Sequence, residues 1–159
     1  TTIEILTPDF LRKNTNYIDI AKVKPDVFNH NLETVPRIYK KIRPGSNYLE
    51  SLKLLREVKE FDKSIFTKSG IMIGLGEEYS EIIKVLKDMK KSNIDFVTIG
   101  QYLQPSIHHE KVHKFYSPDE FKSLYNYCLN LGFKMISSSP MTRSSYHADE
   151  DFEKLKKAI

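Results

Sequence analysis

The sequence contains one cysteine, Cys128, so an internal disulfide bond is impossible. This residue lies in a segment with helical periodicity, residues 121–129. A cysteine on such a segment is typically a small buried apolar residue, and we expect an unreactive thiol there. The sequence therefore excludes a disulfide-stabilised scaffold.

Long apolar runs are also missing, since none approaches the roughly 20 residues that a membrane-spanning helix needs. No signal or transit peptide is recognisable at the N-terminus, so we expect a protein that is neither secreted nor bound to a membrane. The chain opens with Thr1 to Leu6, which resembles the middle of a strand, followed by Thr7-Pro8. We therefore expect it to be the C-terminal part of a larger α/β enzyme.

The positive charge is small and spread along the chain, with 25 Lys and Arg against 21 Asp and Glu, a net charge of +4. No stripe of basic residues with interleaved aromatics is present, which argues against nucleic acid as a partner. A solvated, lysine-rich surface is the simplest interpretation, and a docking face for an acidic partner is the alternative. With 159 residues, 40% of them hydrophobic, we expect a single globular region.

Strand-like and helix-like segments alternate along the chain. Short apolar runs predict strands at residues 3–6, 27–31, 66–74, 94–99 and 133–136. Helical patterns are found at residues 9–23, 35–42, 48–61, 77–91, 117–131 and 149–158. This alternation indicates parallel βαβ units, hence an α/β fold that is either an open sheet or part of a (β/α) barrel. In both architectures the functional residues follow the strands.

The first polar strand exit contains Asn29, Asn31 and Glu33. If the extended conformation continues, alternation places these three side chains on one face. Asparagines also satisfy free backbone groups in tight strand-to-helix turns. A binding site and a capped turn are therefore both open interpretations.

The next exit is rich in glycine, from Gly70 through Gly74 to Glu77. It lacks the Rossmann glycine spacing and the Walker lysine. Glycine at a strand end allows a ligand to approach the backbone closely. It is equally typical of a tight turn, with Glu77 at the start of the following helix.

Two other clusters suggest chemistry less strongly. His108, His109 and His113 would suit a metal, but their spacing is not that of a zinc helix and no cysteine accompanies them. Residues 144–149 contain Ser, His and Asp as close neighbours in sequence, whereas a catalytic triad converges from separate elements. A polar loop before the last helix is the simpler interpretation.

Taken in order, several blocks resemble lipoyl synthase, a radical S-adenosylmethionine (SAM) enzyme. The blocks are Asp26 to Thr34, Arg43-Pro44-Gly45, Thr67 to Gly70, Gly74 to Glu77, Thr98 to Ser106 and Arg143 to Asp149. The resemblance implies the C-terminal part of a partial (β/α) radical-SAM barrel, with parallel strands alternating with helices over residues 1–159.

This resemblance also implies a reaction, the insertion of two sulfur atoms into a protein-bound octanoyl-lysine. The family uses SAM and two [4Fe-4S] clusters. Its partner is an octanoylated carrier protein, either the H protein or the lipoyl domain of a dehydrogenase E2 subunit. Its compartment is the bacterial cytoplasm, the mitochondrion or the plastid.

Residue roles carry over block by block. By resemblance, Ser145 binds the auxiliary cluster through its hydroxyl oxygen, and Arg143 orients that loop or offsets the cluster charge. The remaining predicted cofactor-binding residues lie at the strand exits: Asn29, Asn31, Glu33, Gly74, Glu77 and Gln101. Tyr102 and Gln104 are candidates for contact with either cofactor or substrate. The sequence departs from the family pattern at Met72, where isoleucine is usual, and at Glu78-Tyr79 and Ser139, which lie in turns that tolerate change.

The main departure is the absence of the two cysteine triads that hold the family's clusters. Because such clusters need several thiolates, we expect the isolated chain to bind no cluster and to be inactive. A non-catalytic half barrel that docks a lipoyl carrier protein, and an unrelated phosphate-binding barrel enzyme, are the alternatives. A half barrel leaves open edge strands, so we also expect self-association.

Overall fold

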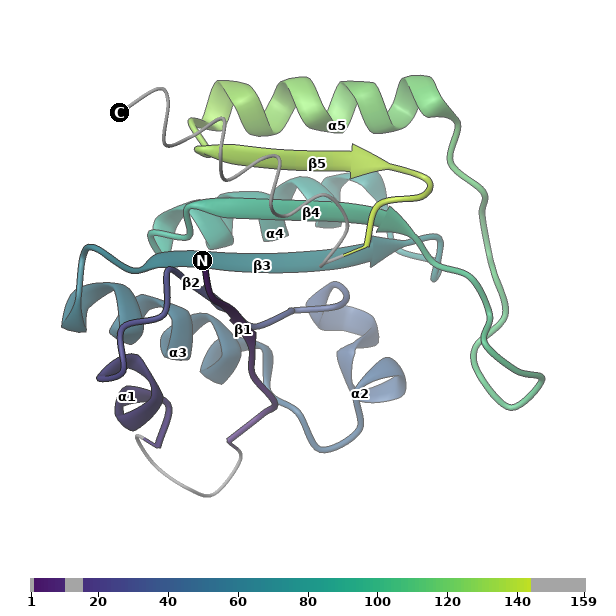
Figure 1. The fold of residues 1–159 in the computed structure, drawn as a ribbon. Helices are drawn as coiled ribbons and strands as arrows, with labels where there is room; N and C mark the ends of the chain where they lie inside the picture. The colour runs from purple at the N-terminus through teal and green to yellow at the C-terminus, as the bar shows by residue number, and fades with distance from the viewer. Residues whose placement is uncertain (1, 11–15, 144–159) are drawn as a thin grey trace.

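The computed structural model describes residues 2–10 and 16–143 (Figure 1). Five parallel strands form one sheet in the order β1-β2-β3-β4-β5, the same order as in the sequence. The strands are β1 (Glu4–Leu6), β2 (Val27–Asn29), β3 (Phe66–Ile73), β4 (Phe96–Gln101) and β5 (Met135–Ser139). The predicted α/β fold with parallel strands and intervening helices is confirmed.

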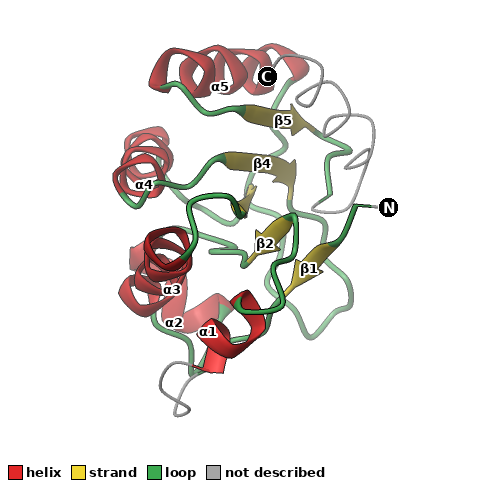
Figure 2. Cartoon of the chain, turned by 60° about the vertical axis from the view of Figure 1, so that its left-hand side comes forward, coloured by secondary structure: helices red, strands yellow, loops and turns green. Residues whose placement is uncertain are grey.

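The helices connect successive strands and lie on one face of the sheet (Figure 2). They are α1 (Asn16–Ala21), α2 (Tyr39–Ile42), α3 (Tyr48–Phe61), α4 (Tyr79–Lys91) and α5 (Pro118–Leu131), with a 3-10 turn η1 (Pro36–Ile38) before α2. The main apolar core fills the space between helices and sheet, through residues such as Leu55, Leu86, Ile99 and Leu124. In the described part of the chain, no helix has the length and apolarity to cross a membrane.

Local chemistry explains where α5 begins and ends. The Ser117 hydroxyl accepts a hydrogen bond from the Glu120 backbone N–H, and the Glu120 carboxylate accepts from the backbone of Ser117. This capping box satisfies free N–H groups in the first turn. Gly132 ends the helix in the left-handed conformation, at φ 80°, which glycine adopts at low cost.

Several predicted elements differ from those observed, including the strands expected at 27–31 and 133–136, which are Val27–Asn29 and Met135–Ser139. The expected helix over residues 9–23 is shorter, because the Thr7 backbone still pairs with Asn29 and the Asp9 side chain is bound to Arg43 and Ser46. The fourth strand extends through Gly100 and Gln101, which pair with Met72 and Ile73 of β3. The last predicted helix, residues 149–158, lies outside the described residues.

Candidate functional site at the carboxyl ends of the strands

The face of the sheet opposite the helices has an apolar end and a polar end. Alternation along paired strands places Val27, Phe66, Phe96 and Met135 on this face, and these four side chains pack together. The next positions towards the carboxyl ends are polar or small: Asn29, Lys68, Gly70, Thr98 and Ser137. A polar ligand would therefore lie near the carboxyl ends.

Lys68 lies on this face and is 1% exposed. Its ammonium group is 3.0 Å from both carboxylate oxygens of Glu4. The Asn29 amide donates to the same carboxylate over 2.8 Å, so Asn29 is bound within the protein, although its Oδ1 is buried without a partner. Contact between Asn29 and a ligand stays a prediction. Because the Asn29 side chain is hydrogen-bonded to Glu4, Asn29 lies deeper in the protein than Asn31.

The turn after β2 has an unusual backbone. Glu33 has φ 68°, a left-handed conformation that costs about 1–3 kcal/mol for a residue with a side chain. The Glu33 N–H donates to the Gly70 carbonyl over 2.9 Å, and the Met72 N–H donates to the Glu33 carbonyl over 2.8 Å. The adjoining strand thus holds Glu33 in this conformation.

Two polar atoms of this turn lack partners. The side-chain oxygens of Asn31 and Thr34 are buried and make no hydrogen bond. A buried acceptor without a donor is costly, typically by about 1–3 kcal/mol, and such atoms are found where a ligand supplies the missing partner. Both are suited to a ligand that carries hydroxyl donors.

The ionisation of Glu33 is balanced between opposing influences. Burial raises the pKa of the Glu33 carboxyl, while the positive charge of Arg43 and a hydrogen bond from Asn31 act against that rise. Asp9 adds to the rise through its negative charge. The resulting pKa lies above the usual value for glutamate.

Gly70 packs closely against the residues beside this turn. A Cβ atom at Gly70 would lie 2.4 Å from the Thr98 hydroxyl and 3.1 Å from Asn31 Oδ1. Any side chain here would displace the residues that border the turn. The absence of a side chain thus lets Thr98 and Asn31 lie close to the backbone of β3.

The glycine turn after β3 is held together by Glu77. Its carboxylate accepts from the Gly74 N–H over 2.6 Å and from the Leu75 N–H over 2.8 Å, and the Tyr116 hydroxyl donates to it over 3.1 Å. Gly74 has φ 111°, and a Cβ there would lie 2.3 Å from Gln101 Nε2. The geometry gives Gly74 and Glu77 a structural role, and their contact with a cofactor stays a prediction.

Gln101 anchors the long loop between β4 and α5, which extends from the ends of the strands in Figure 1. Its amide donates to the carbonyls of Tyr102 and Lys114, each over 3.0 Å, and its carbonyl accepts from the Tyr116 N–H over 3.0 Å. These bonds occupy a side chain that is 4% exposed. The predicted ligand contact of Gln101 is untested.

The segment after β5 folds over the same edge. The Thr142 hydroxyl lies 3.0 Å from the Ser137 hydroxyl and 2.9 Å from that of Ser139. Arg143 is exposed, and its guanidinium donates to the Thr142 carbonyl over 2.6 Å. The predicted cluster ligand Ser145 lies outside the described residues.

Metal ligands do not converge in the described part of the chain. No group of three or more His, Cys, Asp or Glu residues there could hold a metal ion. His109 is hydrogen-bonded to Ser106 and His113 to Glu110, so both side chains have partners within the loop. Burial raises the pKa of the Cys128 thiol to about 12, as expected for an inert residue.

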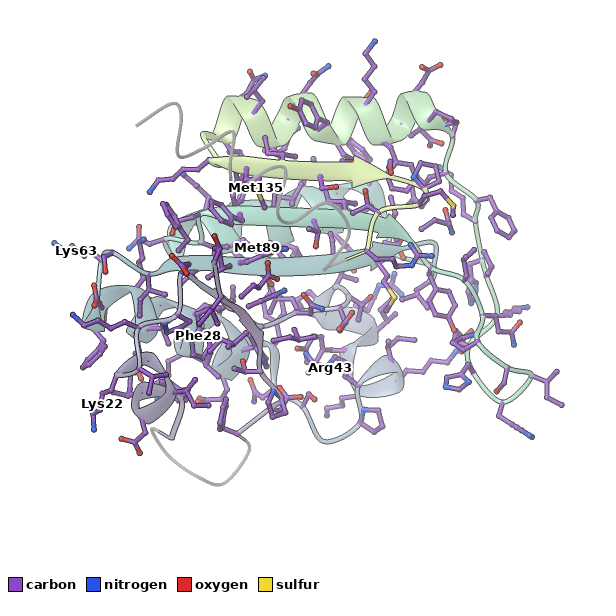
Figure 3. All side chains as sticks on the ribbon, in the orientation of Figure 1. Lys22, Phe28, Arg43, Lys63, Met89 and Met135 are labelled. Atoms are coloured by element: carbon purple, nitrogen blue, oxygen red, sulfur yellow. The ribbon has the colours of Figure 1, made fainter. Side chains whose placement is uncertain are left out.

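A basic cleft of about 440 Å³ lies at the opposite end of the strands, near Lys63 in Figure 3. Its lysines are largely engaged within the protein, since Lys59 and Lys134 each lie 2.8 Å from Asp95. Lys90 donates to the Gly132 carbonyl over 2.5 Å. This pattern indicates ion pairing around the ends of helices rather than an anion site.

Three residues around the site were not singled out from the sequence. Arg43 and Lys68 lie in blocks that resemble the family, but neither carried a predicted role. Tyr116 lies at the end of a loop, and nothing in the sequence indicates its contact with Glu77 39 positions away. A charged residue within a predicted buried strand, such as Lys68, is the one signal that could have been used.

Comparison with solved structures shows the same architecture. SuiB from Streptococcus suis matches with a TM-score of 0.66 and 16% sequence identity over 91% of this chain and 34% of that chain. SuiB bound to S-adenosylmethionine gives a TM-score of 0.63, also at 16% identity, over 91% of this chain and 34% of that chain. Methylornithine synthase (PylB) matches with a TM-score of 0.58 and 16% identity over 93% of this chain and 54% of that chain.

At such identities these likenesses concern the fold alone. This chain spans between about one third and one half of the length of the solved chains it matches. The family assignment has independent support, because residues 1–89 match the Radical SAM superfamily. This segment includes β1 to β3, the turn at Asn31–Glu33 and the glycine turn. The chain therefore belongs to the radical SAM superfamily.

Proposed function

We propose that this chain forms the SAM-facing part of a lipoyl synthase, which inserts two sulfur atoms into a protein-bound octanoyl-lysine. The observation that carries the proposal is the turn after β2, where the buried Asn31 oxygen lacks a donor and lies close to Gly70 of β3. The six sequence blocks that resemble lipoyl synthase support this narrower assignment within the superfamily.

The described residues fit the nucleoside part of SAM. Its ribose carries two hydroxyl donors, and Asn31 and Glu33 offer acceptors at one strand exit. When bound, SAM supplies the radical that removes hydrogen from unactivated carbon, while these side chains orient the nucleoside.

The described residues do not fit an iron–sulfur cluster. The one cysteine of the sequence, Cys128, is buried in α5 among core residues. Cluster ligation requires several thiolates, which must then come from outside residues 1–159. On this proposal the isolated chain is inactive and acts within a longer protein.

The proposed substrate is a lysine presented by a carrier protein. SuiB, which shares this fold, has been solved bound to the precursor peptide SuiA. We extend this to an octanoylated H protein or E2 lipoyl domain. The compartment would then be the bacterial cytoplasm, the mitochondrion or the plastid.

Ser145 provides the test of the lipoyl synthase assignment. In the complete enzyme, Ser145→Ala should lower the iron content of the auxiliary cluster and the yield of lipoyl-lysine from octanoylated carrier protein. Ser144→Ala is the matched control, since it removes a neighbouring hydroxyl and should change neither quantity. Unchanged cluster content and product yield in Ser145→Ala would contradict the proposal.

A further inference from the structure

Arg43 connects three separate parts of the structure. Its Nη1 donates to the Asn31 carbonyl over 2.7 Å and to the Tyr39 hydroxyl over 2.8 Å, and its Nη2 donates to Asp9. The guanidinium carbon also lies 5.6 Å from the centre of the Tyr39 ring. Figure 3 shows Arg43 beside α2, far from Lys63 at the opposite end of the molecule.

Asp9 is itself fixed by several donors. The Ser46 hydroxyl lies 2.5 Å from Asp9 Oδ2, and the Ser51 hydroxyl lies 3.5 Å from Oδ1. Neutral His30 adds no donor, because its Nδ1–H faces the Thr7 carbonyl and its Nε2, 3.4 Å from Oδ1, carries no proton. A planar guanidinium held by a carboxylate has one favoured orientation, so Asp9 sets the direction in which Arg43 points at the turn.

The turn that Arg43 contacts is the strained one. Glu33 adopts φ 68°, and such conformations persist only where the surroundings determine them. The adjoining strand bonds to the backbone of Glu33 on one side, while Arg43 bonds to the carbonyl of Asn31 on the other. Arg43 thereby holds the start of the turn.

We propose that Arg43, oriented by Asp9, is a positioning residue that fixes the Asn31–Glu33 turn, so that Asn31 and Glu33 can accept hydrogen bonds from the ribose of SAM. The inference rests on the nucleoside contact of this turn in the proposed function. Arg43 would act on SAM binding through the turn and through Glu33, without contact with the ligand.

The charges around Glu33 define a pH signature. The charges of Arg43 and Asp9 act on Glu33 in opposite directions: Arg43 lowers the pKa of Glu33, and Asp9 raises it. His30 faces Asp9, and burial lowers the pKa of His30, so it is neutral near pH 7. Removal of the Arg43 charge therefore shifts protonation of Glu33 to higher pH, and ribose binding should weaken at a higher pH than in the wild type.

The test is the dissociation constant of SAM in the complete, cluster-loaded enzyme, measured as a function of pH by anaerobic equilibrium dialysis. Arg43→Met should weaken binding about tenfold near neutral pH and move the acid limb of the profile upward. Arg43→Lys keeps the charge but loses the planar fork, so its acid limb should stay near that of the wild type. Arg56→Met, which alters a half-exposed arginine on α3, is the matched control.

The double variant Arg43→Met/Glu33→Gln separates the possible outcomes. Glu33→Gln alone should abolish the acid limb, and adding Arg43→Met should then produce no further pH dependence. If Arg43→Met has no effect on binding, the positioning role is overturned, and if it weakens binding equally at all pH values, the effect of its charge on Glu33 is overturned. If Arg43→Met behaves as expected but no lipoyl-lysine forms in the wild type, the lipoyl synthase assignment fails and the inference stands.

Discussion

Lys68 and Glu4 form an ion pair that spans β2, with the ammonium nitrogen 3.0 Å from both carboxylate oxygens. Lys68 is 1% exposed, whereas the Glu4 side chain is 22% exposed. Water thus reaches the carboxylate but not the ammonium group. The two partners should consequently respond differently to substitution.

Glu4→Gln should destabilise the protein by roughly 3 kcal/mol, because it leaves the Lys68 ammonium buried without a counter-charge. Lys68→Met should cost less, since the carboxylate left behind is partly hydrated. The double variant should recover most of the loss. Urea unfolding measures all three, and equal costs for the two single variants would argue against this asymmetry.

Glu33 should show a conflict between stability and binding. Glu33→Gly should be more stable than Glu33→Ala by roughly 1 kcal/mol, because glycine adopts the left-handed conformation without a Cβ penalty. Both variants should bind SAM weakly, since both lack the carboxylate. Thermal unfolding and SAM binding report the two effects, and equal stability of the two variants would mean that the backbone is unstrained.

Gly70→Ala should destabilise the protein and weaken SAM binding, because its Cβ would lie 2.4 Å from the Thr98 hydroxyl. The cost of such overpacking is about 1–3 kcal/mol. Thr98→Ala in the same chain removes the clashing oxygen and should restore much of the stability. If the Gly70→Ala variant has the same urea midpoint as the wild type, the residues around Gly70 can move to accommodate the extra methyl group.

His30 should make stability depend on pH. It is buried, with Nδ1 3.0 Å from the Thr7 carbonyl oxygen and Nε2 3.1 Å from the Ser51 hydroxyl. Burial lowers its pKa, although the Thr7 carbonyl and Asp9 oppose the change. The unfolded state therefore binds the proton more tightly, so this contribution is complete above about pH 6.5 and is lost as pH falls through the folded pKa.

The urea midpoint, measured from about pH 8 down to pH 5, should fall in the lower half of this range. His30→Gln should lower the midpoint at neutral pH and flatten its dependence on pH. His108→Gln, at an exposed position of the long loop, is the control and should leave the slope unchanged. A wild-type slope retained in His30→Gln would assign the effect to other groups.

Much of the fold could be predicted from the sequence because apolar periodicity and capping residues are local signals. The 48–61 helix and the Ser117–Gly132 boundaries of α5 matched the structure. Gly100 and Gln101 were expected in a loop, yet they are strand residues because they pair with β3. That pairing is a long-range property that no local pattern contains.

The candidate site could be predicted only in part from such local signals. Asn31 and Glu33 lie in one turn, but the alternation expected from an extended strand does not reach Glu33, because its backbone is left-handed. Alternation could not show that Glu77 and Gln101 bond to the protein itself, since those partners are fixed by tertiary contact. The positive φ of Glu33 was likewise hidden, because a glutamate carries no sequence signal for it.

The central claim, that the Asn31–Glu33 turn binds the ribose of SAM, is tested most directly with a ribose analogue. The complete enzyme should bind S-adenosylhomocysteine about tenfold more tightly than its 2′-deoxy or 3′-deoxy analogue, because a lost hydroxyl leaves a buried acceptor unpaired. Glu33→Gln and Asn31→Ala should each reduce this preference. Equal affinity for the hydroxylated and deoxy ligands in the wild-type enzyme would contradict the account.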